Sequence, residues 1–213
     1  ARADRPFLAT TTAAAEEDDD GVWSLEGGSQ RVGPRRALSL ATEYAFSPVT
    51  SAQVELARWR DRAAGETAHE AEFELKHLFN RIGRDGWGWG VVAALGFDKP
   101  DGRAWTRSGV SLAVPYTLPL WGGDGALHLN AGLDKPRGAT REWRWAAALE
   151  RELLPRTTFF AEAAREGDAR LLHGGLRWWI RRERVALGLS LQRVRAGGER
   201  ASGLVIGVGW YDL

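Results

Sequence analysis

Residues 70–79 read EAEFELKHLF and alternate between two kinds of side chain. The even positions from 70 to 76 are charged, whereas the odd positions are apolar or aromatic with the exception of His77. Successive side chains of a β-strand point to opposite faces, so this stretch predicts a strand with one charged and one apolar face. Residues 87–97, WGWGVVAALGF, keep the same period, with mostly large residues at odd positions and Gly, Val or Ala at even positions.

The alternation recurs from Val22 to the C-terminus and defines about twelve segments of roughly ten residues each. A tilted strand needs about nine to eleven residues to cross a bilayer, and bacterial single-chain barrels have an even number of strands. The sequence therefore predicts an all-β fold, a transmembrane antiparallel up-and-down β-barrel with short loops over residues 21–213. With a periplasmic N-terminus, the periplasmic turns lie near residues 47–50, 80–85, 119–125, 154–157 and 181–184. The external loops lie near residues 33–35, 62–67, 98–103, 135–140, 167–170 and 195–200.

Aromatic residues gather at the ends of the predicted strands, which favours a membrane barrel over the alternative, a soluble β-sandwich. Amphipathic rings are stable at the depth of lipid headgroups, whereas a soluble core would hold such bulk at strand centres. The girdle predicted at the periplasmic ends comprises Trp23, Tyr44, Phe46, Phe79, Trp87, Trp89, Tyr116, Trp178 and Trp210. The aromatic residues that map to the opposite ends are Trp59, Phe97, Trp105 and Trp143.

The composition excludes several other classes of protein. The chain has no cysteine, which rules out disulfides, thiol nucleophiles and zinc–thiolate sites. Its 29 basic and 28 acidic residues leave a net charge of +1, without the basic excess of a nucleic-acid-binding protein. The chain begins with ARA and contains no methionine, as expected for an exported protein after signal-peptide cleavage. We therefore expect it in the outer membrane.

Residues 1–20 stand apart because they lack the alternation. They contain TTTAAA at 10–15 and EEDDD at 16–20. This composition predicts a flexible N-terminal periplasmic segment, which is a candidate plug for the barrel. The acidic run itself is expected to be solvated.

The polar faces of the predicted strands would line the lumen. The expected lumen residues are Glu55, Glu70, Glu72, Glu74, Lys76, Arg107, His128, Asn130, Glu142, Arg144, Glu150, Glu162 and Arg177. Carboxylates in a narrow tube must find cations, or their pKa values rise. Two interpretations stay open: a lining that selects permeating ions, and a charge network that fills and stiffens the tube.

No catalytic or metal-binding pattern stands out in the sequence. His69, His77, His128 and His173 lack the spacing of metal ligands, and a lone histidine beside carboxylates is more often a structural hydrogen-bonding group. There is no Gly-x-Ser-x-Gly elbow, and His77 is expected to face lipid. We therefore expect no cofactor, no metal and no enzymatic activity. An outer-membrane enzyme acting on lipid or peptide remains an alternative.

Over residues 21–213 the chain resembles Gram-negative outer-membrane barrels. The resemblance rests on its regular strands, its tryptophan girdles and its final residues, Tyr211-x-Leu213. Such barrels usually close on Phe or Trp, whereas this chain ends in Leu213 and has small residues at Gly207 and Gly209. The blocks ADRPFL at 3–8 and GWGWG at 86–90 resemble a proteobacterial transporter family associated with aromatic-degradation operons. In that family, the Arg-Pro-Phe stretch is often followed by Thr-Asp-Asp, whereas this chain has ATT at 9–11. The resemblance implies a channel or transporter without catalytic residues.

These features predict a narrow passive channel or transporter with a charged lumen. The alternative is an occluded barrel with a structural or partner-binding role. The expected partners are outer-membrane lipids, lipopolysaccharide and a small solute, and no nucleic acid. Arginines at the external ends of the strands would contact lipopolysaccharide phosphates, because the guanidinium fork suits phosphate geometry.

Overall fold

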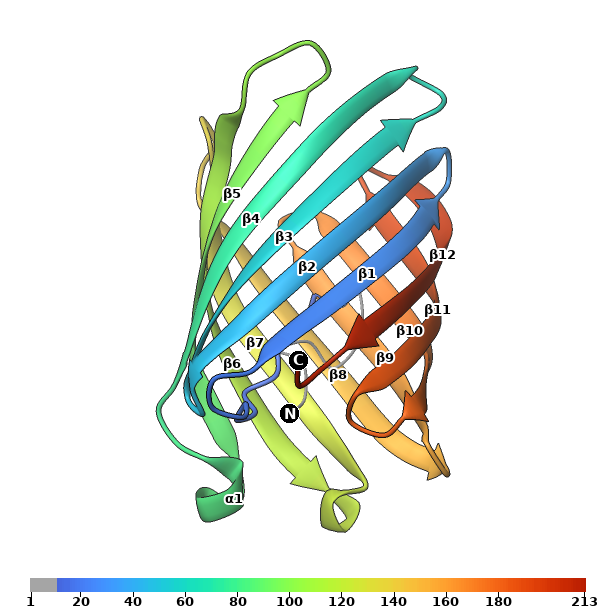
Figure 1. Cartoon of the computed structure of the whole chain (residues 1–213). Coiled ribbons are helices and arrows are strands. Elements are labelled where there is room, and N and C mark those ends of the chain that lie inside the picture. Colours follow the sequence, from blue (N-terminus) through green and yellow to red (C-terminus); the bar gives the residue numbers. More distant parts are fainter. Residues whose placement is uncertain (1–10) are drawn as a thin grey trace.

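The computed structural model describes residues 11–213 and contains a closed antiparallel β-barrel (Figure 1). Each strand pairs with its neighbours in sequence, and β1 pairs with β12 to close the barrel. The strands are β1 (Trp23–Val32), β2 (Arg35–Ser47), β3 (Thr50–Asp61), β4 (Glu66–Leu78), β5 (Gly88–Pro100), β6 (Thr106–Leu120), β7 (Gly125–Pro136), β8 (Glu142–Leu154), β9 (Thr157–Glu166), β10 (Ala169–Arg181), β11 (Val185–Ala196) and β12 (Glu199–Trp210). The predicted fold class, strand order and strand number are confirmed.

Two short helical turns, α1 (Ile82–Asp85) and η1 (Trp121–Gly123), lie in connections at the end of the barrel where β1 begins and β12 ends (Figure 1). We call this end the periplasmic end, following the orientation predicted from the sequence, and the other the external end. Within residues 11–213, no helix is long and apolar enough to cross a membrane.

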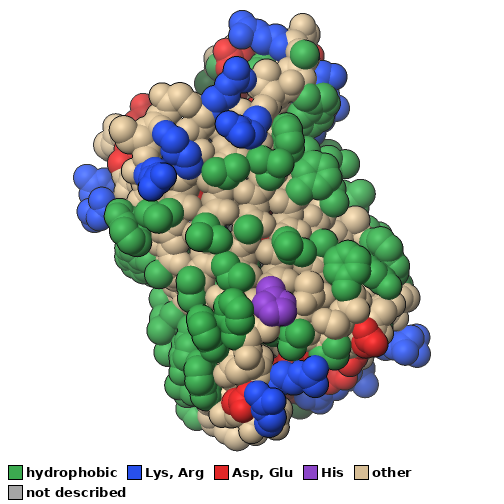
Figure 2. Space-filling view, turned by 90° about the vertical axis from the view of Figure 1, so that its left-hand side faces the viewer, with side chains coloured by type: hydrophobic (Ala, Val, Ile, Leu, Met, Phe, Trp, Pro, Cys, Tyr) green, Lys and Arg blue, Asp and Glu red, His purple; other side chains and the backbone are tan. Residues whose placement is uncertain are grey.

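The outer surface of the barrel is apolar between its two ends. Leu112 on β6 is 50% exposed and Phe73 on β4 is 49% exposed. Figure 2 shows hydrophobic side chains spread over the middle of one face, with charged side chains gathered toward the two ends. A soluble monomer rarely exposes such an extended apolar surface, whereas the hydrocarbon core of a bilayer requires one.

Aromatic rings contact one another along the periplasmic end. The ring pairs Trp23–Tyr44, Tyr44–Phe46, Phe79–Trp89 and Trp87–Tyr116 have centroids 4.6–5.5 Å apart. Trp178 and Trp210 are exposed at the same end of β10 and β12. The nine residues predicted for this girdle thus share one end of the barrel, at the level where headgroups would meet their rings.

Two side chains lie on the opposite face from the one predicted. A register shift after Gly96 places Arg107 opposite Phe97, whose ring packs on that of the exposed Phe73. Arg107 therefore lies on the outer face, because a β-bulge adds one residue and reverses the alternation beyond it. Trp59 lies inside, opposite the buried Ala37, and its indole N–H donates to Glu70 Oε2 at 2.6 Å.

The orientation leads to a labelling prediction. The chain has no native cysteine, so single cysteines can be introduced without competing thiols. Ala63→Cys, in the connection between β3 and β4, should react with a membrane-impermeant thiol reagent on intact cells. Val49→Cys, in the turn between β2 and β3, should react only after the outer membrane is permeabilised. The reverse pattern would show that the barrel has the opposite orientation.

Candidate functional site

The lumen holds the charged and polar residues of the inward strand faces. Of the predicted lumen residues, the structure buries Lys76, His128, Asn130, Glu150, Glu162 and Arg177. Others line internal cavities, namely Glu55, Glu70, Glu72, Glu74 and Arg144. Glu142 pairs with the buried Asp134 and so faces inward near the external end. Only Arg107, among the residues predicted for the lumen, falls on the outer face.

The N-terminal segment, defined here as residues 11–18, runs inside the barrel at its periplasmic side. Its first anchor is Glu162 on β9, whose Oε1 accepts hydrogen bonds from Thr11 N, Thr12 N and Thr12 Oγ1 at 2.7–2.8 Å. Thr12 is fully buried. Hydrogen bonds to a carboxylate are stronger than those between neutral groups, so Glu162 is the strongest polar anchor in this part of the segment.

Glu162 is itself held by a buried histidine on β10. His173 Nδ1 lies 3.2 Å from Glu162 Oε2, and His173 Nε2 lies 2.8 Å from Ser190 Oγ. A ring that donates from Nδ1 to the carboxylate and accepts at Nε2 from the serine hydroxyl satisfies both contacts. His173 therefore positions the carboxylate that binds the N-terminal segment, in keeping with a structural rather than catalytic role.

Two further strands bind the backbone of the segment. Asn130 on β7 accepts from Ala13 N through Oδ1 at 2.6 Å and donates from Nδ2 to Ala13 O at 2.9 Å. Thr117 on β6 accepts from Ala15 N at 2.8 Å. Gly88 on β5 allows this close approach, since a Cβ atom at that position would overlap the carbonyl oxygen of Ala15. Lumen side chains thus pair with several of the buried backbone groups of the segment.

The acidic run is only partly solvated, which corrects the expectation from the sequence. Asp18 is 8% exposed, and its Oδ2 lies 3.0 Å from Nζ of the buried Lys76 on β4. Glu43 on β2 lies 3.9 Å from the same ammonium. Burial, followed by the charge of Glu43, raises the pKa of Asp18 to about 8. Lys76 therefore contacts this end of the segment directly.

The segment contributes residues to two of the cavities inside the barrel. The external cavity, about 280 Å³, includes Thr11 and Ala13 in its lining, together with Glu26, Glu55, Glu72, Glu74, Glu166 and Arg144. The periplasmic cavity, about 440 Å³, includes Glu16, Glu17, Glu150 and Arg177. The described part of the segment therefore lies between an acidic chamber and the periplasmic opening.

Near the C-terminal end, the side chain of Tyr211 points into the lumen, on the face opposite to the exposed Trp210. Tyr211 is buried, and its hydroxyl donates to Glu26 Oε1 at 2.6 Å. Burial and the neighbouring Glu26 carboxylate raise the pKa of this phenol. A Cβ atom at Gly209 would overlap the phenol, so the unusually small residue noted there in the sequence makes room for Tyr211.

Comparisons with known proteins bear on the fold. No protein-family model matches the chain, and no curated protein matches its sequence. Among solved structures, the chain is similar to the KdgM porin (TM-score 0.63, 9% identity) and the NanC porin (TM-score 0.64, 10% identity), covering 88% of this chain and 98% of each porin. It is also similar to the CymD monoaromatic hydrocarbon channel (TM-score 0.53, 8% identity; 91% of this chain and 88% of that one). The chain therefore has the fold of an outer-membrane β-barrel of the porin type.

Proposed function

We propose that this barrel is a narrow passive channel of the outer membrane, with a preference for small cations or neutral polar solutes. The observation that carries the proposal is the external cavity, whose lining has five glutamates and one arginine. A chamber lined by charges of mostly one sign inside a low-dielectric protein concentrates cations and repels anions. The porin-type fold supports a role in permeation, although fold alone does not identify a solute.

The N-terminal segment acts in this proposal as a plug that restricts the periplasmic side. Its hydrogen bonds to Glu162, Asn130 and Thr117 hold it across the lumen. The same contacts support the alternative, an occluded barrel with a structural role, if the segment never leaves. Single-channel recording of the refolded protein in planar bilayers separates the two, because a permanently occluded barrel gives no conductance steps.

The proposed solute differs from those named for the neighbouring structures. A KdgM porin structure is described as a complex with oligogalacturonate, which is a polyanion. The glutamates of the external cavity would repel such a ligand. The resemblance to transporters of aromatic-degradation operons suggests an aromatic solute instead. Part of that resemblance rests on residues 3–8, which lie outside the described residues. The polar lining of the cavity favours small polar cations over a hydrocarbon.

We also propose that lipopolysaccharide contacts the external end of the barrel. A groove of about 670 Å³ lies near that end, lined by apolar residues that include Trp145 and Leu172 and by the arginines Arg165, Arg170, Arg193, Arg195 and Arg200. Guanidinium groups beside an apolar surface suit a ligand that joins phosphates to acyl chains.

The selectivity proposal predicts the effect of removing cavity charge. Replacing Glu55, Glu72 and Glu74 together with Gln should lower the cation-to-anion permeability ratio toward unity, because three carboxylates leave the external cavity. The reversal potential in a salt gradient measures this ratio. A control triple at exposed positions outside the cavity linings, Asp20→Asn, Asp124→Asn and Glu199→Gln, should change it less. An unchanged reversal potential in the cavity variant would contradict a selective role for these residues.

A further inference from the structure

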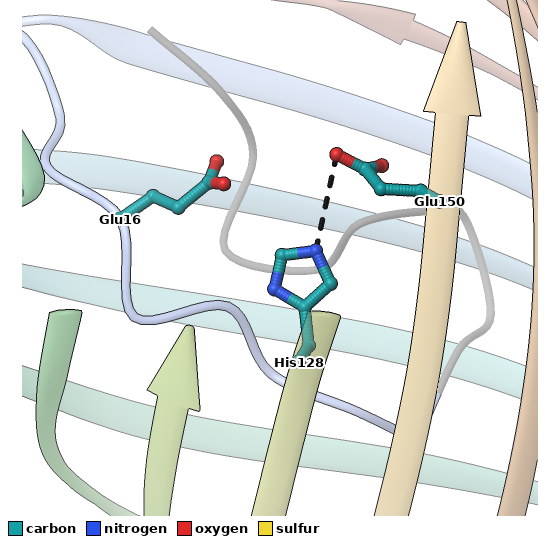
Figure 3. A group of neighbouring side chains, drawn as sticks. All are labelled: Glu16, His128 and Glu150. Carbon is teal, nitrogen blue, oxygen red and sulfur yellow. Dashed lines mark ion pairs between the residues drawn. The ribbon is translucent and has the colours of Figure 1, made fainter. Parts of the chain in front are cut away.

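Three potential metal ligands from distant parts of the sequence meet beside the N-terminal segment (Figure 3). Glu16 belongs to that segment, His128 to β7 and Glu150 to β8. Each offers one ligand atom, and these atoms all lie within 4.8 Å of one another. The group combines one imidazole nitrogen with two carboxylates.

His128 has an unsatisfied nitrogen directed into this group. The residue is fully buried, and its Nδ1 lies 2.9 Å from Thr117 Oγ1. Its Nε2 has no hydrogen-bond partner among residues 11–213 and lies 3.8 Å from Glu150 Oε1, beyond hydrogen-bond distance. Buried ring nitrogens are seldom left without a partner, so Nε2 is a candidate metal ligand.

The contact to Thr117 prepares Nε2 for a metal ion. If Nδ1 carries the proton and donates it to the threonine hydroxyl, Nε2 presents a lone pair toward Glu16 and Glu150. Metal-bound histidines are commonly oriented by such a hydrogen bond from the other ring nitrogen. Thr117 also accepts from Ala15 N, one residue before Glu16, and so fixes the ring and the segment together.

We propose that Glu16, His128 and Glu150 bind a divalent transition-metal ion of the zinc class. Zinc binds imidazole nitrogen and carboxylate oxygen at about 2.0–2.2 Å, often with three protein ligands and an open position. Ligand atoms around such an ion are at most about 4.4 Å apart, so atoms within 4.8 Å of one another need only a small closure. Magnesium and calcium are excluded as preferred ions, since they select oxygen ligands over imidazole.

The site has a route for the ion. Glu16 and Glu150 line the periplasmic cavity of about 440 Å³, whose lining carries five glutamates and two arginines. This acidic balance attracts cations to the opening. Because one ligand comes from the N-terminal segment and two from the wall, a bound ion would hold the segment in place. Binding does not require that the barrel conduct, so the site stands apart from the proposed channel function.

The test is calorimetric titration of the refolded full-length chain with ZnCl₂ alone. One saturable site is expected. Glu16→Gln and His128→Gln should each weaken binding by at least about tenfold, since each removes a ligand. The matched controls are Glu17→Gln, one residue along the same segment, and Glu152→Gln, two residues along β8. Both controls line the same cavity without belonging to the ligand group, so each should keep one saturable zinc site and lose far less affinity than the ligand variants. Titration with MgCl₂ should give no comparable binding.

A second measurement connects the ion to the segment. Zinc should slow proteolysis or amide exchange of residues 11–18 in the parent and not in Glu16→Gln, whose substitution lies outside every strand. The absence of saturable zinc binding by the parent would overturn the proposal. So would equal losses in Glu16→Gln and Glu17→Gln, or magnesium binding as tight as zinc binding. If His128→Gln does not fold, the Glu16 and Glu17 pair decides the question.

Discussion

Gly88→Ala is expected to conduct severalfold more current than the parent in single-channel recordings. The added methyl group would overlap the carbonyl of Ala15, and the Ile82 side chain is also close. Strand β5 pairs with β6 at Gly88 and with β4 from Gly90 onward, so it should yield less than the segment. The N-terminal segment is free of such pairing, so it should be the part that moves out of the lumen. Faster amide exchange at residues 11–15 should accompany the larger current.

Gly27→Ala is the matched control for this experiment. Gly27 lies on the outer face of β1, where the nearest atoms to an added Cβ are 4.0 Å away. This variant should conduct and resist heat as the parent does. If Gly88→Ala releases the segment but leaves the current unchanged, the segment is not the restriction. If neither protein conducts, the occluded-barrel alternative is favoured.

The barrel could be predicted from the sequence because bilayer and lumen impose opposite demands on successive side chains. In β4, lipid selects Phe73 and Leu75 while the lumen accommodates Glu72 and Glu74, and this contrast repeats around the barrel. Alternation is a local property of the chain, and neighbouring strands pair in sequence order. The fold could therefore be predicted almost without information on contacts between residues that are distant in the sequence.

The two misplaced residues show where this local reasoning fails. A β-bulge at residues 96–97 and 107–109 changes the parity of β6, and no residue type in the sequence marks it uniquely. Trp59 follows the alternation of β3 without exception, and its assignment to the outer face came from its residue type alone. Indole N–H groups are equally stable inside when a carboxylate such as Glu70 accepts from them.

The contacts of the N-terminal segment could not be predicted for a different reason. Thr12 and Glu162 are separated by 150 residues, and the segment is bound largely through its backbone amides. Every residue except proline offers such a donor, so the sequence does not specify the partner. Gly88 was the available signal, since an inward glycine at the start of a strand marks a close approach. The group of Glu16, His128 and Glu150 was missed because it depends on this placement.

Leu112→Arg is expected to lower the free energy of unfolding by about 2–4 kcal/mol, as a charged side chain does at the bilayer midplane. Leu112 is half exposed on the outer face of β6. It lies four residues from Tyr116 in the periplasmic girdle, or about 13 Å along the strand. With the tilt of the strand, this distance places it near the middle of an apolar band about 25 Å tall. Urea titration of protein refolded in lipid vesicles measures the change.

Position along the strand separates this explanation from a general effect of added charge. Leu129 pairs with Tyr116, so Leu129→Arg lies near the headgroups and should lower the free energy of unfolding by only about 0–1 kcal/mol. Ser111→Arg is adjacent to Leu112 but faces the acidic external cavity, where an arginine finds water and carboxylates. It should destabilise the barrel far less than Leu112→Arg. Equal losses at all three positions would show that the apolar face does not contact lipid.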